Sequence, residues 1–178
     1  EELSVFETVD EEQDYSMSFD GNDDYLSIPS DNSILDFYNK DEISISAWIY
    51  LSSHQGQSAI FNCTEEGSAY PQYAFKIDFG KLYFISGTGF FESNGYNIST
   101  NLLPLNEWIN VSFTYDSETV RFYINEELDF ENNVVDSFPS ITNENVYIGS
   151  SVGQNNVNFN GKVSEIQIWD VSLSQNQI

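Results

Sequence analysis

The sequence predicts an all-β protein, an antiparallel jelly-roll β-sandwich. Two segments, EISISAWIYL (residues 42–51) and EWINVSFTYD (residues 107–116), alternate between apolar and polar side chains. This period of two is that of a strand with one face in a core and the other facing out. No segment of useful length shows the 3.6-residue period of an amphipathic helix. Many short, half-buried strands separated by turns are typical of a sandwich or jelly roll.

The alternation also predicts which side chains share a face. In the first segment the inward set is Ile43, Ile45, Ala47 and Ile49, and the other set is Ser44, Ser46 and Trp48. In the second segment the inward set is Ile109, Val111, Phe113 and Tyr115, opposed by Asn110, Ser112 and Thr114. We interpret Trp48, Trp108 and Trp169 as packing residues because all three lie in predicted strands.

Further strands follow in order along the chain. YAFKIDFGKLYFIS is typical of a hairpin around Gly80 and places Phe75, Phe79 and Phe84 in the core. TVRFYINEEL, NVYIGS and KVSEIQIWDVSL are the remaining strand segments, and SLSQNQI is expected to form a short helical turn. Residues 15–178 are therefore expected to form one domain, and the acidic residues 1–14 to be a linker or domain edge.

Charge excludes several classes of partner. Five Lys and Arg residues face 29 Asp and Glu residues, so the formal net charge is −24. Nucleic-acid binding needs cations to displace counterions from phosphates, and an anionic membrane would repel this chain. No apolar run reaches the length of a membrane span, and the single Cys63 excludes an internal disulfide. We expect this domain to be part of a larger protein that is secreted or lies on the cell surface.

A cluster of acids precedes the first strands. The stretch FDGNDDYLSI supplies Asp20, Asn22, Asp23 and Asp24 within one turn. Calcium prefers such oxygen ligands, but Asp and Asn also favour turns on their own, so a solvated turn is the alternative. An EF-hand is excluded because Tyr25 stands where its loop needs Gly and because no helices flank the stretch.

Aromatic residues gather in loop-like sequence between residues 65 and 97. Tyr70, Phe90, Phe91 and Tyr96 lie beside Pro, Gly and Asn residues rather than in predicted strands. Exposed aromatic rings can stack on the C–H faces of sugars, so we predict these four as ligand-binding residues. The alternative is a small core beneath the loop.

The order of the motifs resembles a known family. YSMSFDGNDDYLSI, ISISAWIYL, LPLNEWINVSFTYD, VRFYINEELD, VYIGS and FNGKVSEIQIWDVSLSQNQI together resemble the laminin G-like, concanavalin A-like jelly-roll domains, and bacterial-type modules of secreted proteins in particular. The resemblance covers Tyr15 to Ile178. It implies two stacked antiparallel sheets, binding or adhesion to glycans or proteins, and structural calcium in many members.

The resemblance also carries expectations about single residues. The family places its first strands close to its last, which implies that Glu165 completes a calcium site with the acidic turn. The closing motif is similar to that of pentraxins, but no carboxylate occurs from Gly149 to Asn158. Ser46 and Asn110 stand at the positions that match the pentraxin cysteines. The pentraxin double-calcium site and disulfide are therefore expected to be absent.

Catalysis is not expected. His54 lies in a polar loop and is interpreted as a surface residue, with no nucleophile elbow near it. Glycoside hydrolases on this fold carry the pattern E-x-D-x-x-E, which here reads Glu165, Gln167 and Asp170. Gln167 cannot ionise, and in a regular strand Glu165 and Asp170 point to opposite faces.

The sequence thus predicts a non-catalytic binding and adhesion module that recognises carbohydrate and holds a structural calcium. Its expected partner is an extracellular glycan or a surface protein, with neither nucleic acid nor membrane insertion. Two alternatives stay open, a protein–protein adhesion module without a sugar site and a jelly-roll glycoside hydrolase.

Overall fold

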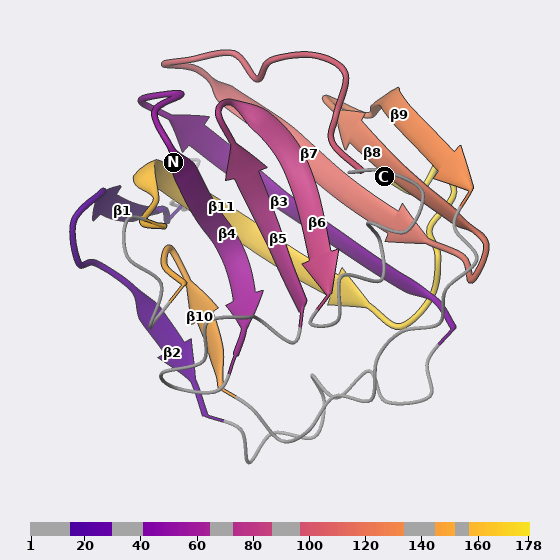
Figure 1. Cartoon of the computed structure of the whole chain (residues 1–178), viewed down its shortest axis with the longest axis horizontal. Helices are drawn as coiled ribbons and strands as arrows, with labels where there is room; N and C mark the ends of the chain where they lie inside the picture. The colour runs from indigo at the N-terminus through magenta and orange to yellow at the C-terminus, as the bar shows by residue number, and fades with distance from the viewer. Residues whose placement is uncertain (1–14, 30–40, 65–72, 87–96, 134–144, 152–156) are drawn as a thin grey trace, which may run out of the picture.

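The protein is an all-β sandwich of two antiparallel sheets, as the sequence predicts. The computed structural model describes residues 15–29, 41–64, 73–86, 97–133, 145–151 and 157–178. In Figure 1 the sheet that contains β4, β5 and β6 lies in front of the sheet that contains β3, β7 and β11. Every described strand pair is antiparallel, and the described residues contain no helix.

The rear sheet has six strands and mixes the two ends of the sequence. Its order is β1-β11-β3-β7-β8-β9. The bounds are β1 Met17–Asp20, β11 Asn160–Trp169, β3 Ile43–Leu51, β7 Trp108–Tyr115, β8 Thr119–Ile124 and β9 Glu127–Asn133. The last strand lies between the first and the third, which is the neighbourhood that the family resemblance implies.

The front sheet has five strands in the order β2-β10-β4-β5-β6. The bounds are β2 Leu26–Ile28, β10 Val146–Ile148, β4 Gln57–Cys63, β5 Tyr73–Asp78 and β6 Lys81–Ser86. Strand β4 is not among the predicted strands: its residues are nearly all buried, and a strand buried on both faces shows no alternation.

The core lies between the sheets and follows the predicted alternation. The predicted inward residues of β3 and β7 are all at most 1% exposed. They meet Phe75 and Phe84 from the front sheet, and the Phe84 and Phe113 rings stack with centroids 3.9 Å apart. Burial of these large apolar side chains from both sheets is the main favourable term that holds the two layers together.

The hairpin around Gly80 is confirmed, but one of its residues is placed differently. Phe79 and Gly80 both have positive φ, 45° and 85°, which is the backbone of a type I′ turn. Phe79 is therefore at the tip of the turn and 67% exposed, so its prediction as a core residue is wrong. A second two-residue turn at Asn125 and Glu126 divides TVRFYINEEL between β8 and β9.

The first strand is fixed to the last by register, and to the glycine that follows β10 by a close contact. Met17 pairs with Val163 and Asp20 with Asn160. The Phe19 ring lies so near Gly149 that a Cβ there would be 2.2 Å from it, and Gly149 has φ 87°. Only glycine suits both conditions.

The remaining predictions on organisation have mixed outcomes. SLSQNQI forms a turn, in which the amides of Gln177 and Ile178 donate to the Ser174 carbonyl. Cys63 is buried and, as the single cysteine, forms no internal disulfide. Within the described residues no helix has the length and apolar character to cross a membrane. Residues 1–14 lie outside the described residues, so the linker stays a prediction.

Candidate functional site

The outer face of the six-stranded sheet is an open surface of aromatic and polar side chains. It contains Trp48 and Trp108, which are 37% and 41% exposed. Their strands are neighbours, with Trp48 opposite Asn110 and Tyr50 opposite Trp108. The two Trp side chains are thus diagonal neighbours on one face of adjacent strands, close enough for one ligand to reach both.

Around Trp108 the surface forms a broad shelf. The Tyr50 and Trp108 rings meet edge to face with centroids 5.9 Å apart, and Lys162 Nζ lies 5.8 Å from the Tyr50 ring centroid. A hollow of about 440 Å³ is lined by Ser16, Trp48, Trp108, Lys162, Ser164 and Glu165. The ring contacts fix these indole and phenol groups before any ligand arrives.

A second and smaller hollow lies further along β3. It has a volume of about 200 Å³ and is walled by Trp48, Trp169, Glu165 and Gln167. Its floor is polar, because Ser46 Oγ accepts hydrogen bonds from Asn110 Nδ2 at 3.2 Å and from Ser112 Oγ at 3.0 Å. Ser112 Oγ also lies 3.1 Å from Asn110 Oδ1. We call this hollow the polar pocket.

The contact between Ser46 and Asn110 bears on the pentraxin similarity. These two residues stand at the positions that match the pentraxin cysteines, and their side chains are in direct contact. A hydrogen bond therefore occupies the place where the resemblance implies a disulfide in pentraxins. Neither residue is a cysteine, so these two side chains cannot form a disulfide.

Glu165 enters the site through a β-bulge. Between Ser164 and Gln167 the register of β11 against β3 shifts by one residue, and Glu165 has φ 47°. A positive φ is uncommon for a glutamate, and a bulge redirects the side chains on either side of it. As a result Glu165 and Gln167 both line the polar pocket, and Glu165 also lines the shelf.

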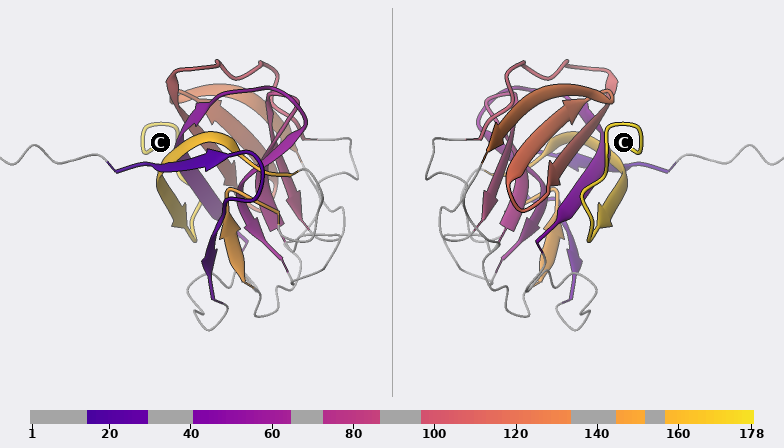
Figure 2. Two further views of the ribbon diagram at one scale, coloured as in Figure 1. Left: turned by 90° about the vertical axis from the view of Figure 1, so that its left-hand side faces the viewer. Right: turned by 90° about the vertical axis from the view of Figure 1, so that its right-hand side faces the viewer.

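The chain beyond β11 closes one end of this surface. Leu173, Gln177 and Ile178 line the polar pocket, and Figure 2 shows the segment on the side of the six-stranded sheet that faces away from the five-stranded sheet. We call residues 171–178 the end segment.

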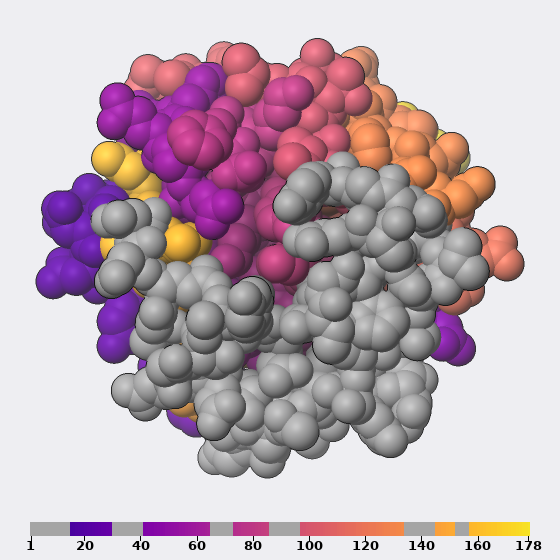
Figure 3. Space-filling view, viewed as in Figure 1, coloured from indigo at the N-terminus to yellow at the C-terminus, as the bar shows by residue number. Residues whose placement is uncertain are grey.

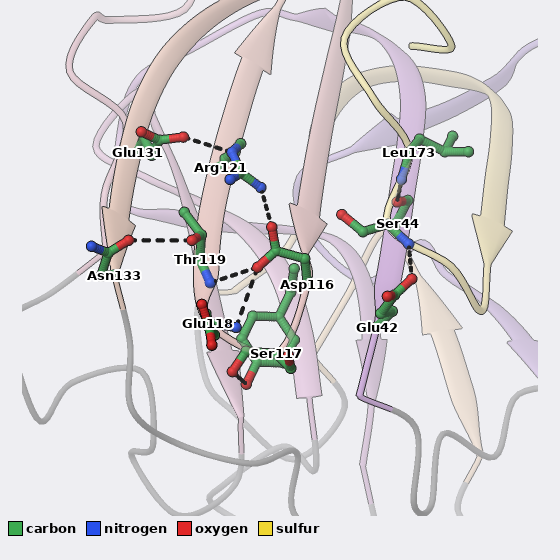
Figure 4. A network of polar contacts seen from close by, with 12 residues as sticks. Glu42, Ser44, Asp116, Ser117, Glu118, Thr119, Arg121, Glu131, Asn133 and Leu173 are labelled. Carbon is green, nitrogen blue, oxygen red and sulfur yellow. Dashed lines mark hydrogen bonds and ion pairs between the residues drawn. The ribbon is translucent and has the colours of Figure 1, made fainter.

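Hydrogen bonds tie the end segment to the sheet, as Figure 4 shows in part. Ser44 Oγ donates to the Val171 carbonyl at 2.8 Å and accepts from the Leu173 amide at 2.8 Å. Glu42 Oε2 accepts from the Ser172 amide at 2.9 Å, and Gln175 Nε2 donates to the Glu126 carbonyl at 3.1 Å. Bonds at both ends of the segment hold it over the sheet.

The interpretation of Trp48 and Trp108 as packing residues is therefore wrong. Trp169 is half-buried in the wall of the polar pocket, so it is partly a packing residue and partly a surface residue. The signal was present in the alternation: Trp48 is in phase with Ser44 and Ser46, and Trp108 with Asn110. A large aromatic residue in the polar phase of a strand has no core to enter, so it indicates a surface function.

The acidic turn forms as predicted, and three of its carboxylates meet. Oxygen atoms of Asp20, Asp23 and Asp24 lie within 4.8 Å of one another, all exposed. Asp20 Oδ1 accepts from the Asn22 amide at 2.8 Å, and Asp24 Oδ2 accepts from the Asp20 amide at 3.0 Å. Hydrogen bonds from the side chain and backbone of Asn22 hold the pKa of Asp20 below its usual range.

Glu165 does not join this turn. Asp20 pairs with Asn160, and Glu165 lies five positions further along β11, which corresponds to roughly 16 Å. The turn is fastened instead to the segment just before β11, because Asn158 Nδ2 donates to the Asn22 carbonyl. The carboxylate oxygens of Asp20, Asp23 and Asp24 fit the oxygen preference of calcium. The turn's own hydrogen bonds also hold it without a metal ion.

Other predicted residues have different outcomes. Tyr70, Phe90, Phe91 and Tyr96 lie outside the described residues, so their role as ligand-binding residues stays a prediction. His54 is not a free surface residue, since its Nε2 donates to the Leu103 carbonyl at 2.7 Å and its ring packs against Gly80. It supports the β5–β6 turn.

Among the described residues that line the two hollows, the pair of carboxylates needed for glycoside hydrolysis is not assembled. Glu165 is the one carboxylate among the described residues that line either hollow. Asp170 follows the end of β11 and lines neither of them. Hydrolysis by the usual route needs two carboxyl groups on opposite sides of the scissile bond.

The sheet edge at β8 and β9 carries an ion-pair network (Figure 4). Arg121 contacts Asp116 and Glu131, each at 2.6 Å. Partial burial alone would raise the pKa of Asp116, but hydrogen bonds from Arg121 and from the Thr119 and Glu118 amides outweigh it and lower the pKa. This network braces the edge and leaves Arg121 unavailable to the aromatic surface.

The outer face of the five-stranded sheet contrasts with this open surface. Asn62 is 0% exposed, and neither its Nδ2 nor its Oδ1 has a hydrogen-bond partner. Lys76 is also buried, its Nζ 3.5 Å from Ser151 Oγ, and burial lowers its pKa to about 8. Figure 3 views this side of the molecule.

A family model described as the concanavalin A-like lectin/glucanases superfamily, Laminin_G_3, matches residues 20–178. The chain belongs to this family. The match confirms the family that the order of motifs indicated, and the two stacked sheets confirm its fold. No curated protein matches the sequence.

Solved structures support the same fold at low sequence identity. A heptameric SAP-like pentraxin from Limulus polyphemus has a TM-score of 0.68 at 18% identity, with 92% of this chain and 79% of that chain covered. Domain 4 of AbnA, an extracellular arabinanase from Geobacillus stearothermophilus solved with arabinotriose, has a TM-score of 0.67 at 17% identity, with 91% and 73% covered.

A Bacteroides ovatus protein assigned to carbohydrate binding has a TM-score of 0.60 at 22% identity. The similarity covers 78% of this chain and 40% of that protein, so this chain spans less than half of that relative. At these identities the comparisons establish the fold.

Proposed function

We propose that this protein is a carbohydrate-binding module that holds a glycan on the outer face of its six-stranded sheet and does not itself catalyse a reaction. The observation that carries the proposal is the pair Trp48 and Trp108, exposed side by side on a face that also carries serine, amide and carboxylate groups. The electron-rich face of an indole attracts the C–H groups on one side of a sugar ring. Neighbouring serine, amide and carboxylate groups can then bond the ring's hydroxyls.

The polar pocket suits the same chemistry. Its Ser46, Ser112 and Asn110 side chains are linked in one network, so each is held in place and still offers donor or acceptor capacity. A site that is already ordered loses less entropy on binding. The solved arabinanase domain with arabinotriose, which shares the fold, supports this proposal.

The absence of catalysis belongs to the proposal. A sugar that lay on the shelf would meet Glu165 without a second carboxylate from the described residues that line the two hollows. We therefore expect Glu165 to accept a hydrogen bond from a hydroxyl group. We also infer a place outside the cell, within a larger secreted or cell-surface protein, which the charge of −24 and the fold of the extracellular arabinanase domain support.

Calcium binding at the acidic turn is a separate proposal. Asp20, Asp23 and Asp24 supply clustered oxygens, with Asn22 between them. Calcium there would offset the repulsion among three carboxylates. Its role would be to stiffen the β1–β2 turn, and it would have no part in the sugar site, because the turn does not include Glu165.

The test of the sugar site is a binding screen with matched variants. The wild-type protein, Trp48→Ala, Trp108→Ala and the control Phe79→Ala are compared by affinity gel electrophoresis on a panel of soluble plant, fungal and bacterial polysaccharides. Phe79 is equally aromatic and more exposed, but it lies in the β5–β6 turn.

We expect at least one polysaccharide to retard the wild type and Phe79→Ala while both Trp variants migrate freely at an unchanged melting temperature. Equal retardation of all four proteins would contradict the site. Retardation of none of them, together with capture of a surface protein, would favour a protein–protein adhesion module. Release of reducing sugars by the wild type would show an enzyme.

A further inference from the structure

The shelf and the polar pocket lie one after the other along β3, and we call the two together the groove. Along β3 the outward residues are Tyr50, Trp48, Ser46 and Ser44 in succession. The shelf lies at the Tyr50 end and the polar pocket around Ser46. From Tyr50 to Ser44 is six positions, or roughly 20 Å along the strand. A linear glycan that follows the strand would cross Trp48 and reach the polar pocket.

At the Ser44 end the groove is blocked. Leu173, Gln177 and Ile178 stand in the wall of the polar pocket, and Ser44 itself bonds the Val171 carbonyl and the Leu173 amide. A chain that entered the pocket could not continue beyond Ser44, because the backbone of the end segment occupies that path. On the shelf side, the described lining residues come from strand faces and Ser16, with no end-segment residue among them.

The two hollows also differ in chemistry in a way that fits one end unit. The shelf is large and presents Trp108 and Trp48, which supply contact area with few directional bonds. The polar pocket is about half that size, with Trp48 and Trp169 in its walls and the Ser46–Asn110–Ser112 network in its floor. Directional donors and acceptors in a small volume select a particular ring.

From this geometry we infer that the module recognises the free end of a glycan chain, with the terminal unit in the polar pocket, the following units over Trp48 and Trp108, and the end segment as the wall that stops the chain. This inference rests on the proposed function. It adds that the protein binds polysaccharides at their chain ends and does not bind at internal positions.

The first experiment separates ends from interior positions. Cello-, xylo-, manno- and α-1,5-arabino-oligosaccharides of two to six units, and their parent polysaccharides, are titrated into the whole protein by calorimetry. Each polysaccharide is measured before and after partial hydrolysis at constant mass, which multiplies the chain ends. We expect binding capacity per gram to rise in proportion to the ends created, and molar affinity for oligosaccharides to become constant once the groove is filled.

Capacity per gram that does not change on hydrolysis would overturn the inference while leaving the sugar site intact. Failure of every oligosaccharide and polysaccharide to bind, or binding that Trp48→Ala does not weaken, would instead contradict the proposed function. Oligosaccharides reduced at their reducing end tell the two kinds of end apart. Retained binding assigns the non-reducing end to the pocket, and lost binding assigns the reducing end.

The second experiment weakens the anchoring of the end segment without changing a residue that lines the polar pocket. Glu42 and Gln175 anchor the end segment but do not line the polar pocket. In the double variant Glu42→Ala, Gln175→Ala, the preference for hydrolysed over intact polysaccharide should fall at least threefold. The control is Glu118→Ala, an exposed turn residue whose side chain has no bond among the described residues.

Each variant is compared with the wild type by its melting curve, so that a loss of folding is recognised. An end preference equal to that of the wild type in the folded double variant would overturn the end segment as the wall. A residual end preference that the further change Leu173→Ala removes would support the end segment as the wall. Leu173 lines the polar pocket, and its amide is bonded to Ser44 Oγ.

Discussion

The two outer faces of this sandwich follow the same alternation but differ in what covers them. On the six-stranded sheet the outward phase contains Trp48 and Trp108, open to solvent, above serine and amide groups that bond one another. On the five-stranded sheet the outward phase contains Asn62 and Lys76, both buried. An open polar face can exchange bound water for a ligand. The polar groups of a covered face have already lost their water, and this desolvation lowers the stability of the folded protein.

The comparison shows that polarity in a strand does not by itself locate a site. Asn62 has two buried polar atoms without a partner, which costs stability, and Lys76 has a lowered pKa because its charge is desolvated. The serines and Asn110 of the other face have hydrogen-bond partners and line the polar pocket, although Ser112 and Asn110 are themselves buried. Loss of the exposed Trp rings should therefore alter binding, and changes at Asn62 and Lys76 should alter stability.

The largest expected effect is on the open face. The double variant Trp48→Ala, Trp108→Ala should weaken glycan binding by about a hundredfold or more, on the order of 3 kcal/mol, because both stacking surfaces are lost. Its melting temperature should change little, since both side chains are well exposed in the free protein. Calorimetry gives the affinity and a melting curve the stability. A variant that binds normally or fails to fold would break the comparison.

The next effect concerns the covered face and depends on pH. The folded pKa of Lys76, about 8, lies below its ordinary value of 10.5. Below pH 8 both folded and unfolded chains hold the proton, and the folded state bears the cost of a buried charge. Between pH 8 and 10.5 the unfolded chain binds more protons, so stability rises with pH through this window.

Lys76→Met removes that charge. It should raise the free energy of unfolding at pH 7 by on the order of 2 kcal/mol, and its advantage over the wild type should shrink as the pH approaches 10.5. Urea unfolding at pH 7 and pH 10 measures both quantities. Lys162→Met on the open face is the matched control for the loss of a lysine charge at the surface. An advantage that grows with pH would have the wrong sign for a buried charged lysine.

A smaller effect is expected at Asn62. Asn62→Leu replaces two unpaired buried polar atoms by apolar ones of similar volume, so it should stabilise the protein by about 1 kcal/mol. The matched change on the open face, Asn110→Leu, removes bonds to Ser46 and Ser112 and should destabilise it. Denaturant midpoints of the two variants should therefore move in opposite directions. Movement in the same direction would contradict the difference between the faces.

The smallest effect is expected at the acidic turn, away from both faces. Calcium should raise the melting temperature relative to chelator by about 2 °C, because a ligand bound to the folded state stabilises it and this turn is already held by its own hydrogen bonds. Asp23→Asn should abolish the shift, since Asp23 loses charge without losing a bond of the turn. An equal shift in Asp23→Asn would place calcium elsewhere.

Much of the fold could be predicted from local pattern. The faces of β3 and β7 were predicted residue by residue, because each strand has one face in the core and one outside it. The prediction failed where that condition failed. β4 is buried throughout and shows no alternation, and Phe79 stands at a positive-φ turn position that turns its ring outward. Strand β8 ended earlier than expected because Asn125 and Glu126 form a tight turn.

The candidate site was predicted less well. The acidic turn formed from neighbours in sequence, so its ligands could be named in advance, but Glu165 was assigned to it through the general proximity of first and last strands. Register decides that question, and it depends on pairing between residues far apart in the chain. Membership of a strand does not by itself imply packing, which is why the exposed Trp pair does not follow from the predicted strands.

The sequence by itself determined the all-β class, the inward and outward phases of the main strands, the strong negative charge and the cluster of oxygen ligands. These depend on side-chain identity and on periods of two residues, which are local properties. Only the tertiary structure decided that one outward face stays open while the other is buried, that a bulge turns Glu165 toward Trp48, and that the end segment crosses β3 at Ser44. These depend on register and coverage, which no short segment contains.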